Sequence, residues 1–208
     1  PIYAFMIVFW ALFDQTGSTW VNQAKNLDKN WLGIEWLPSQ IQAINPIMIL
    51  ILVPLFSYYL YPLINRYFNL TPIKKISIGL FIAVPSFLII GYIQSQIELG
   101  LKPSISWQVI AYSILTASEI FISITCLEFS YTQAPNSMKS IVMSLFLISM
   151  SLGNFMTAAI NEIVPKSFDT GTSAYFYFYS ILMFLTAILF LFAIKNYQHK
   201  TYLHEESA

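Results

Sequence analysis

Six long apolar segments constrain what this chain can fold into. A helix needs about 20 apolar residues to cross a bilayer, and the sequence has segments near this length at 2–22, 40–64, 73–94, 107–130, 139–164 and 173–195. Backbone polar groups must be satisfied internally within lipid, so such segments fold as helices. The sequence therefore predicts an all-α membrane protein, with a bundle of six transmembrane helices over residues 1–195 and a polar tail over 196–208.

The composition agrees with this fold class and excludes others. Of the 208 residues, 57% are hydrophobic and only 10% are charged, whereas soluble domains carry about 25% charged residues. The net charge is zero, so there is no electrostatic reason to expect nucleic acid as a partner. Cys126 is the one cysteine. The sequence contains no metal-ligand spacing, glycine-rich phosphate loop or nucleophile elbow, so we expect neither an enzyme nor a metal or organic cofactor.

The basic residues predict an orientation in the membrane. Cytoplasmic ends of transmembrane helices carry an excess of lysine and arginine, and one set of ends holds Arg66, Lys74, Lys75, Lys139, Lys195 and Lys200. We therefore expect the C-terminus in the cytoplasm. We also expect the protein to lie in the plasma (inner) membrane. The chain opens with Pro1, already inside an apolar segment, and we expect it to be a piece of a longer polypeptide.

A carboxylate at mid-depth of the fourth segment is the clearest sign of function. Glu119 follows Ser118 within the span 107–130. A charge at that depth costs roughly 3 kcal/mol on insertion scales, so such a residue normally faces protein or water and marks a functional site. Thr116 and Ser123 lie three residues before and four residues after it, which places them on the same helical face.

Two further polar positions lie inside apolar segments. Trp10 and Asp14 share a helical face with Gly17 in the first segment, which suits a helix that lines a cavity. Asp14 could instead be a helix-end carboxylate near the headgroups. Asn45 precedes Pro46 in the second segment, where its amide either faces a cavity or bonds to a neighbouring helix.

These stretches together resemble a known family. They are FWALFDQTGS at 9–18, QIQAINP at 40–46, SE at 118–119 and LEFSYTQAPNSMKS at 127–140. The run F-S-Y-x-Q-A-P-x-x-M-K-S is similar to that of the proton-dependent oligopeptide transporter family, within the major facilitator superfamily. The resemblance extends over nearly all of the chain and implies the C-terminal half, helices seven to twelve, of a twelve-helix transporter.

The resemblance also implies a site. In the family, the positions of Asn45 and Glu119 hold the α-amino group of the substrate, and that of Asp14 is the acid of the extracellular gate. Phe146 falls where many members have tryptophan, so side-chain selectivity is expected to differ. The implied substrate-binding residues are Trp10, Asn45, Ser118, Glu119, Phe146, Ser149 and Met150. The implied proton-coupling or gating residues are Asp14 and Glu119.

The function implied is proton-coupled symport of di- and tripeptides by alternating access, with protons as the coupling ion. The partners implied are the peptide, the lipid bilayer and the N-terminal six-helix half, because the basic residues that would pair with the two acids lie in that half. Two alternatives stay open. The same fold can carry another small solute such as nitrate, or the chain can belong to a non-transporting, peptide-binding membrane protein.

Overall fold

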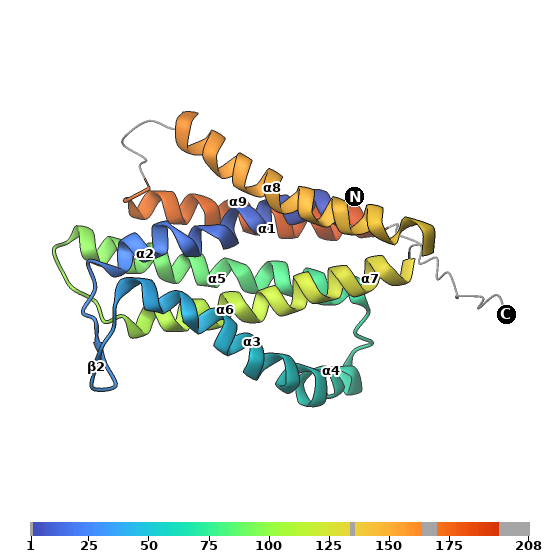
Figure 1. Ribbon diagram of the computed structural model, residues 1–208, viewed down its shortest axis with the longest axis horizontal. Helices are drawn as coiled ribbons and strands as arrows, with labels where there is room; N and C mark the ends of the chain where they lie inside the picture. Colours follow the sequence, from blue (N-terminus) through green and yellow to red (C-terminus); the bar gives the residue numbers. More distant parts are fainter. Residues whose placement is uncertain (1, 134–135, 164–169, 196–208) are drawn as a thin grey trace.

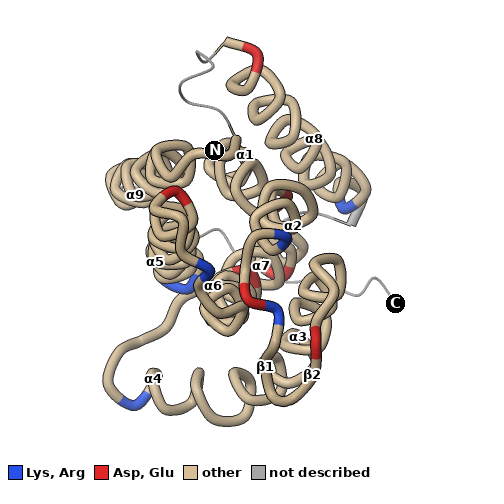
Figure 2. The backbone as a smooth tube through the Cα atoms, turned by 90° about the vertical axis from the view of Figure 1, so that its left-hand side faces the viewer, with Lys and Arg blue, Asp and Glu red and all other residues tan. Residues whose placement is uncertain are grey.

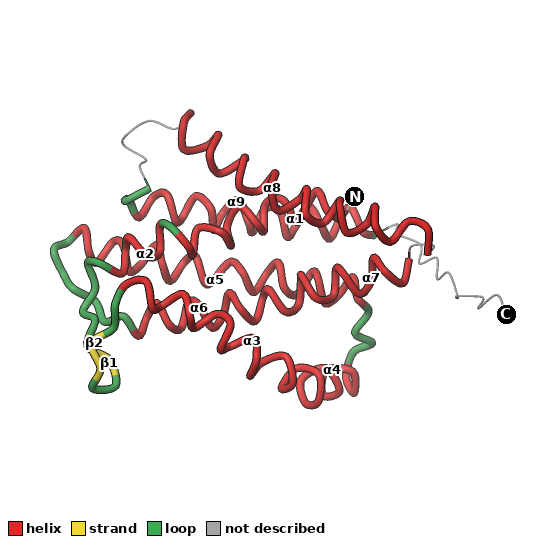
Figure 3. Tube along the Cα trace, in the orientation of Figure 1, coloured by secondary structure: helices red, strands yellow, loops and turns green. Residues whose placement is uncertain are grey.

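The computed structural model describes residues 2–133, 136–163 and 170–195, which form a helical bundle with a small hairpin at one end (Figure 1). Helices make up nearly all of it (Figure 3). The elements are α1 (Ile2–Phe13), η1 (Asp14–Gly17), α2 (Thr19–Ala24), β1 (Asn30–Trp31), β2 (Ile34–Glu35), η2 (Pro38–Ala43), α3 (Ile44–Leu55), η3 (Phe56–Leu60), α4 (Tyr61–Tyr67), α5 (Pro72–Glu98), α6 (Ser106–Glu119), η4 (Ile120–Ile124), α7 (Thr125–Gln133), η5 (Asn136–Met138), α8 (Lys139–Ile163) and α9 (Ser173–Ile194). The predicted tail over 196–208 lies outside the described residues.

The prediction of an all-α membrane protein is confirmed. Within the described residues, 5 helical stretches are long and apolar enough to cross a membrane: Pro38–Tyr67, Pro72–Glu98, Ser106–Thr132, Lys139–Ile163 and Ser173–Ile194. They correspond to the last five predicted segments. The first segment, at 2–22, is helical for most of its length but is not one continuous helix, so a count of six continuous helices is not reproduced.

The first segment is interrupted by its own polar side chains. α1 ends at Phe13, and the 3-10 turn η1 precedes α2. Ser18 Oγ and Thr19 Oγ1 donate to the carbonyl of Gln15 at 3.4 and 3.2 Å, and Gln15 Nε2 donates to the carbonyl of Ala11 at 2.9 Å. Short polar side chains that bond to nearby backbone groups favour turns over continuous helix. The polar run that starts at Asp14 therefore breaks the helix.

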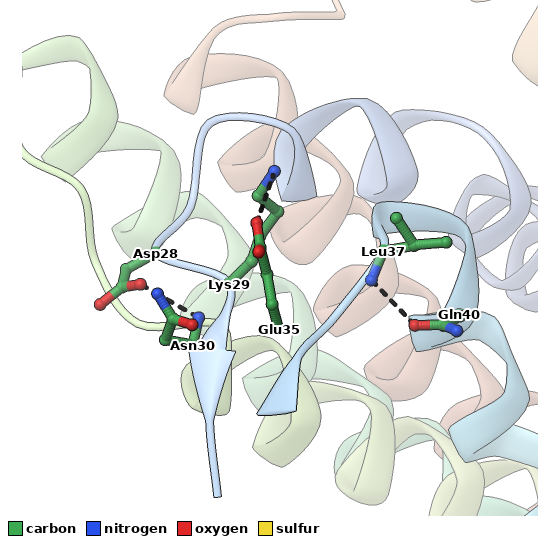
Figure 4. Close-up of polar contacts among 6 residues, drawn as sticks. All are labelled: Asp28, Lys29, Asn30, Glu35, Leu37 and Gln40. Atoms are coloured by element: carbon green, nitrogen blue, oxygen red, sulfur yellow. Dashed lines mark hydrogen bonds and ion pairs between the residues drawn. The ribbon is translucent and has the colours of Figure 1, made fainter. Parts of the chain in front are cut away.

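The connection between the first two predicted segments, residues 23–39, contains a hairpin at one end of the bundle (Figure 3), and Figure 4 shows its polar contacts. Strands β1 and β2 pair in antiparallel fashion. The turn residues Leu32 and Gly33 have φ angles of 56° and 73°, which is the positive-φ pair of a type I′ turn. Lys29 Nζ lies 3.9 Å from Glu35 Oε1 across the hairpin, in an exposed position where such a pair contributes little to stability.

Helix α5 packs between α6 and α9. At Gly79, an added Cβ would lie 2.6 Å from Ile122 Cγ1 and 2.9 Å from Phe121 Cβ. Both atoms belong to η4, so α5 approaches the segment after α6 as closely as a glycine permits. Ser118 Oγ adds a hydrogen bond of 2.8 Å to the carbonyl of Gly79. Small residues allow this kind of close helix packing in lipid.

Helix α8 packs on α1 in the same way. A Cβ at Gly153 would lie 2.8 Å from both the carbonyl oxygen of Ile7 and Cβ of Trp10. Seen along the bundle, α5 and α9 lie on the left, whereas α8 and α3 lie towards the right (Figure 2). The helix pairs α1–α8 and α3–α6 carry the predicted site residues, and α5 and α9 support them.

Candidate functional site between helices α1, α3, α6 and α8

Glu119 is the last residue of α6 and stands directly before the π-helical segment η4. Its side chain is half-buried. A π-helical turn widens the helix by one residue and occurs often at functional sites. The chain therefore positions this carboxylate at a local irregularity of a membrane-spanning helix, with α5 packed behind it.

Asn45 of α3 binds Glu119 across the helix pair. Its Nδ2 donates to Glu119 Oε2 at 2.9 Å and to Thr116 Oγ1 at 3.0 Å. Thr116 lies one turn before Glu119 and is completely buried. An ionised carboxylate accepts hydrogen bonds only, so the amide nitrogen, not the amide oxygen, faces Glu119.

This geometry sets the direction of the Asn45 amide oxygen. Both N–H groups of the amide are directed at Thr116 and Glu119, so Oδ1, which lies in the same plane, points away from these two partners. The helix pair thus carries two kinds of acceptor, the Glu119 carboxylate and Oδ1 of Asn45. Two or three acceptors of this kind suit a ligand that offers several N–H donors and a positive charge.

Asp14 lies on a second helix pair. Asn154 Nδ2, from α8, donates to Asp14 Oδ2 at 2.7 Å. One turn away, Thr157 Oγ1 donates to the carbonyl of Ala11 at 3.0 Å, which ties α8 to α1. Asp14 sits where α1 gives way to η1, so the carboxylate stands at a helix break with an amide as its partner.

The aromatic residues predicted to line the site are brought together. The rings of Trp10 and Phe146 meet edge to face with centroids 5.8 Å apart, and Tyr3 contacts Phe146 at 6.3 Å. Trp10 and Phe146 are 5% and 7% exposed. Nε1 of Trp10 is buried and has no hydrogen-bond partner among the described residues.

Three predicted site residues lie apart from these contacts. Ser118 is fully buried and faces α5, to which its Oγ donates. Ser149 is also buried, and its Oγ donates at 2.6 Å to the carbonyl of Phe146 in its own helix. Met150 packs against the hydrophobic core beside α1. Ser118 therefore contributes to the packing of α6 on α5, and its role in substrate binding stays a prediction.

Within the described residues, the charged side chains of the site are carboxylates without a basic partner. Among the described residues the only ion pair is Lys29–Glu35 in the hairpin, so neither Asp14 nor Glu119 has a basic partner there. The described residues contain no group of three or more histidine, cysteine, aspartate or glutamate side chains that could hold a metal ion. Within the described residues, an asparagine amide therefore pairs with each of the two carboxylates, Glu119 in a membrane-spanning helix and Asp14 in the turn η1.

Two residues of this arrangement were not predicted as part of the site. The sequence predicts only that Thr116 shares a helical face with Glu119, three residues later. That spacing is the one signal for its contact with Asn45. Asn154 lies eight residues after Phe146, on the same face of α8, and its partner Asp14 lies 140 residues away in sequence. Spacing along a helix identifies a face but not the residue opposite it.

A bundle with several helices long and apolar enough to cross a membrane is that of a polytopic membrane protein. The family model for the POT family matches residues 1–177 of the chain. The chain belongs to this family, as its resemblance to the proton-dependent oligopeptide transporters implied.

Individual relatives agree with this assignment. The peptide transporter PTR2 of Saccharomyces cerevisiae is 29% identical over 209 residues, covering 94% of this chain and 34% of that protein. The crystal structure of an auto-inhibited POT family peptide transporter matches with a TM-score of 0.86 at 31% identity, over 96% of this chain and 40% of that chain. The POT family transporter PepTSo matches with a TM-score of 0.84 at 34% identity, over 95% and 40%. This chain therefore spans about a third of the yeast relative and two fifths of the solved transporters.

Proposed function

We propose that this chain supplies the C-terminal half of a proton-coupled symporter for di- and tripeptides. The observation that carries the proposal is the pairing of Glu119 with Asn45 inside membrane-spanning helices, without a basic partner among the described residues. The peptide transporters among its relatives support the substrate class. The proposed setting is the plasma (inner) membrane, with the C-terminus in the cytoplasm.

The α-amino group of a peptide fits the acceptors at this pair. An ammonium group has three N–H donors and one positive charge, and the site offers Glu119 together with Oδ1 of Asn45. A carboxylate in a membrane-spanning helix is costly without a compensating charge. A bound ammonium group supplies that charge, so the substrate stabilises the ionised form of Glu119.

The edge-to-face pair of Trp10 and Phe146 supplies an aromatic wall for the side chains of the peptide. Nε1 of Trp10 is a buried donor without a partner among the described residues, and leaving a buried donor unpaired is costly. Because Phe146 has no donor, it contributes shape and polarisable surface only.

Protons couple to the same acids. In the absence of peptide, a proton neutralises Glu119 or Asp14 and removes the cost of a buried charge. Peptide binding to ionised Glu119 competes with the basic residue that would otherwise pair with this carboxylate, while Asp14 keeps its proton, so that peptide and proton cross the membrane together. In this scheme the two halves rock about a site near the middle of the membrane. The hydrogen bond from Asn154 to Asp14 links the position of α8 to the carboxylate at the end of α1.

The basic residues expected to pair with Glu119 and Asp14 belong to a second six-helix half. Helices α3 and α8 bury few of their residues, and large apolar side chains on both are exposed, Leu50 at 77% and Phe155 at 71%. An unpaired intramembrane acid is expensive, so basic residues of an N-terminal half are the expected partners of Glu119 and Asp14. We therefore propose that the chain functions within a twelve-helix protein.

The test is uptake of dialanine by cells or proteoliposomes that contain the full-length transporter, with an imposed inward proton gradient. Glu119→Gln keeps the size and hydrogen-bonding capacity of the side chain but removes its charge, so gradient-driven uptake should be lost. Glu128→Gln is the matched control, because Glu128 is exposed in α7 and should retain uptake. Normal gradient-driven uptake by Glu119→Gln would refute the proposal.

The same assay separates the alternatives. Inhibition of uptake by excess dialanine but not by nitrate supports the peptide substrate, and the reverse supports the small-anion alternative. Binding of dialanine without flux in proteoliposomes supports a non-transporting membrane protein. The proposed symporter requires flux that depends on both peptide and proton gradient.

A further inference from the structure

An apolar groove lies on another part of the bundle, where α4, the beginning of α5 and the end of α9 meet. Its volume is about 680 Å³. Its walls are almost entirely apolar, with Phe68 from the segment after α4, Pro85 from α5 and Leu191 from α9. None of the residues of the peptide site lines it. The groove is therefore separate from the peptide site.

The groove is open at the surface of the described bundle. Phe68 and Leu191 line it and are 71% and 45% exposed. Helix α4 stands away from α5 in both views of the bundle (Figures 1 and 2), joined to it by a short connection. Large exposed apolar surfaces mark contact with a membrane or a partner, and these helices belong to membrane-spanning stretches. An acyl chain is the occupant that the surroundings supply.

Lys74 gives the groove a single positive charge at its rim. It is the one charged residue among those that line the groove. Lys74 Nζ donates to the carbonyl of Asn69 at 2.8 Å, which uses one of its three N–H donors. The remaining donors are available to a phosphate oxygen. An apolar groove with one cation at its end matches the two parts of an anionic phospholipid.

The neighbouring lysine provides a contrast. Lys75 does not line the groove. Its Nζ lies 4.1 Å above the ring of Tyr61, in a cation–π contact. The two lysines are adjacent in sequence and equal in charge, yet only Lys74 borders the groove.

We infer that this groove is a binding site for an anionic phospholipid, with an acyl chain in the groove and the headgroup phosphate on Lys74. Moving an acyl chain from bulk lipid into an apolar groove gains little, since lipid tails are as apolar as the protein. Selectivity therefore rests on the headgroup, and one basic residue near an anionic headgroup strengthens binding about fivefold. With the orientation expected from the basic residues, this end of the bundle lies in the cytoplasmic leaflet, where anionic lipids are concentrated.

The test measures lipid bound to the full-length protein. The protein is purified from nanodiscs of equal parts phosphatidylglycerol and phosphatidylcholine, and retained lipids are counted by native mass spectrometry. Wild type and Lys75→Gln should both prefer phosphatidylglycerol, whereas Lys74→Gln should lose about fivefold of that preference. Both lysine variants change the net charge equally, so a general loss of charge is controlled.

A second pair of variants tests the groove itself. Leu191→Trp places a larger side chain in the groove and should reduce retained phosphatidylglycerol, whereas Leu189→Trp changes an exposed residue of the same helix that does not line the groove. Equal phosphatidylglycerol preference in Lys74→Gln and Lys75→Gln would overturn the inference. Equal retention of the two lipids by wild type would do the same, because it would leave an apolar groove without headgroup selectivity.

Discussion

Replacing Thr116 by valine should weaken the binding of the peptide amino group without unfolding the protein. Valine has nearly the same shape as threonine but lacks the hydroxyl that accepts from Asn45 Nδ2 at 3.0 Å. The bond from Asn45 to Glu119 can still form, yet the amide is then fixed by one partner instead of two. The position of the amide oxygen, which we propose as an acceptor for the ammonium group, becomes less defined.

The size of the effect follows from one hydrogen bond between membrane helices. Such bonds contribute about 0.6 kcal/mol on average and up to about 1.7 kcal/mol. If the loss falls on substrate binding, KM for dialanine rises about threefold, with about twentyfold as the upper bound. The maximal rate should change less than KM, because the interaction is present in both the bound and the transition state.

The assay is the initial rate of dialanine uptake against concentration, for wild type, Thr116→Val and Thr116→Ser. Serine keeps the hydroxyl, so Thr116→Ser should stay close to wild type. Competition by N-acetyl-dialanine supplies a second control, because this peptide lacks the ammonium group and its inhibition constant should be the same in all three proteins. An unchanged KM in Thr116→Val, or an equal loss for both peptides, would refute the role of Thr116 in orienting Asn45.

Three further predictions concern other parts of the structure. Gly153→Ala places a methyl group 2.8 Å from atoms of α1 and should destabilise the protein by about 1–3 kcal/mol as an overpacked contact, measured by denaturant unfolding, whereas Gly171→Ala, which meets nothing within 4 Å, should not. Gln108→Leu removes the buried bond of 2.8 Å from Nε2 to the carbonyl of Trp20 and should lower stability by about 1–3 kcal/mol in the same measurement. Asp14→Asn cannot take up a proton, so uptake that rises in wild type as the external pH falls should become flat; a wild-type pH profile would contradict its role in coupling.

The residues near Glu119 show which features the sequence predicts and which depend on the local helix geometry. Hydropathy identified the membrane segments, and the carboxylate at mid-depth identified Glu119. Constant helical spacing also placed Ser123 on the face of Glu119. The structure has a π-helical segment directly after Glu119, and the extra residue per turn changes which residues follow on that face. Ser123 is 9% exposed, and its buried hydroxyl has no partner among the described residues.

The other misses have a common cause. The break after Phe13 and the hairpin turn at Leu32 depend on local bonds of polar side chains and on a positive φ angle that leucine rarely adopts. The contact of Asp14 with Asn154 joins α1 to α8, and its geometry depends on Gly153, whose missing side chain allows the two helices to approach. Periodicity describes one helix at a time, so contacts between helices require the packed structure.

The two acids share a feature that bears on how they could work. Each carboxylate is held by an asparagine from another helix, Glu119 by Asn45 at 2.9 Å and Asp14 by Asn154 at 2.7 Å. A lysine or arginine partner would fix the acid in its charged form. An asparagine amide can donate through its nitrogen to a carboxylate, or accept through its oxygen from a carboxylic acid, after turning over. The same contact can therefore persist in both protonation states, so each helix pair would stay joined if its carboxylate gained or lost a proton.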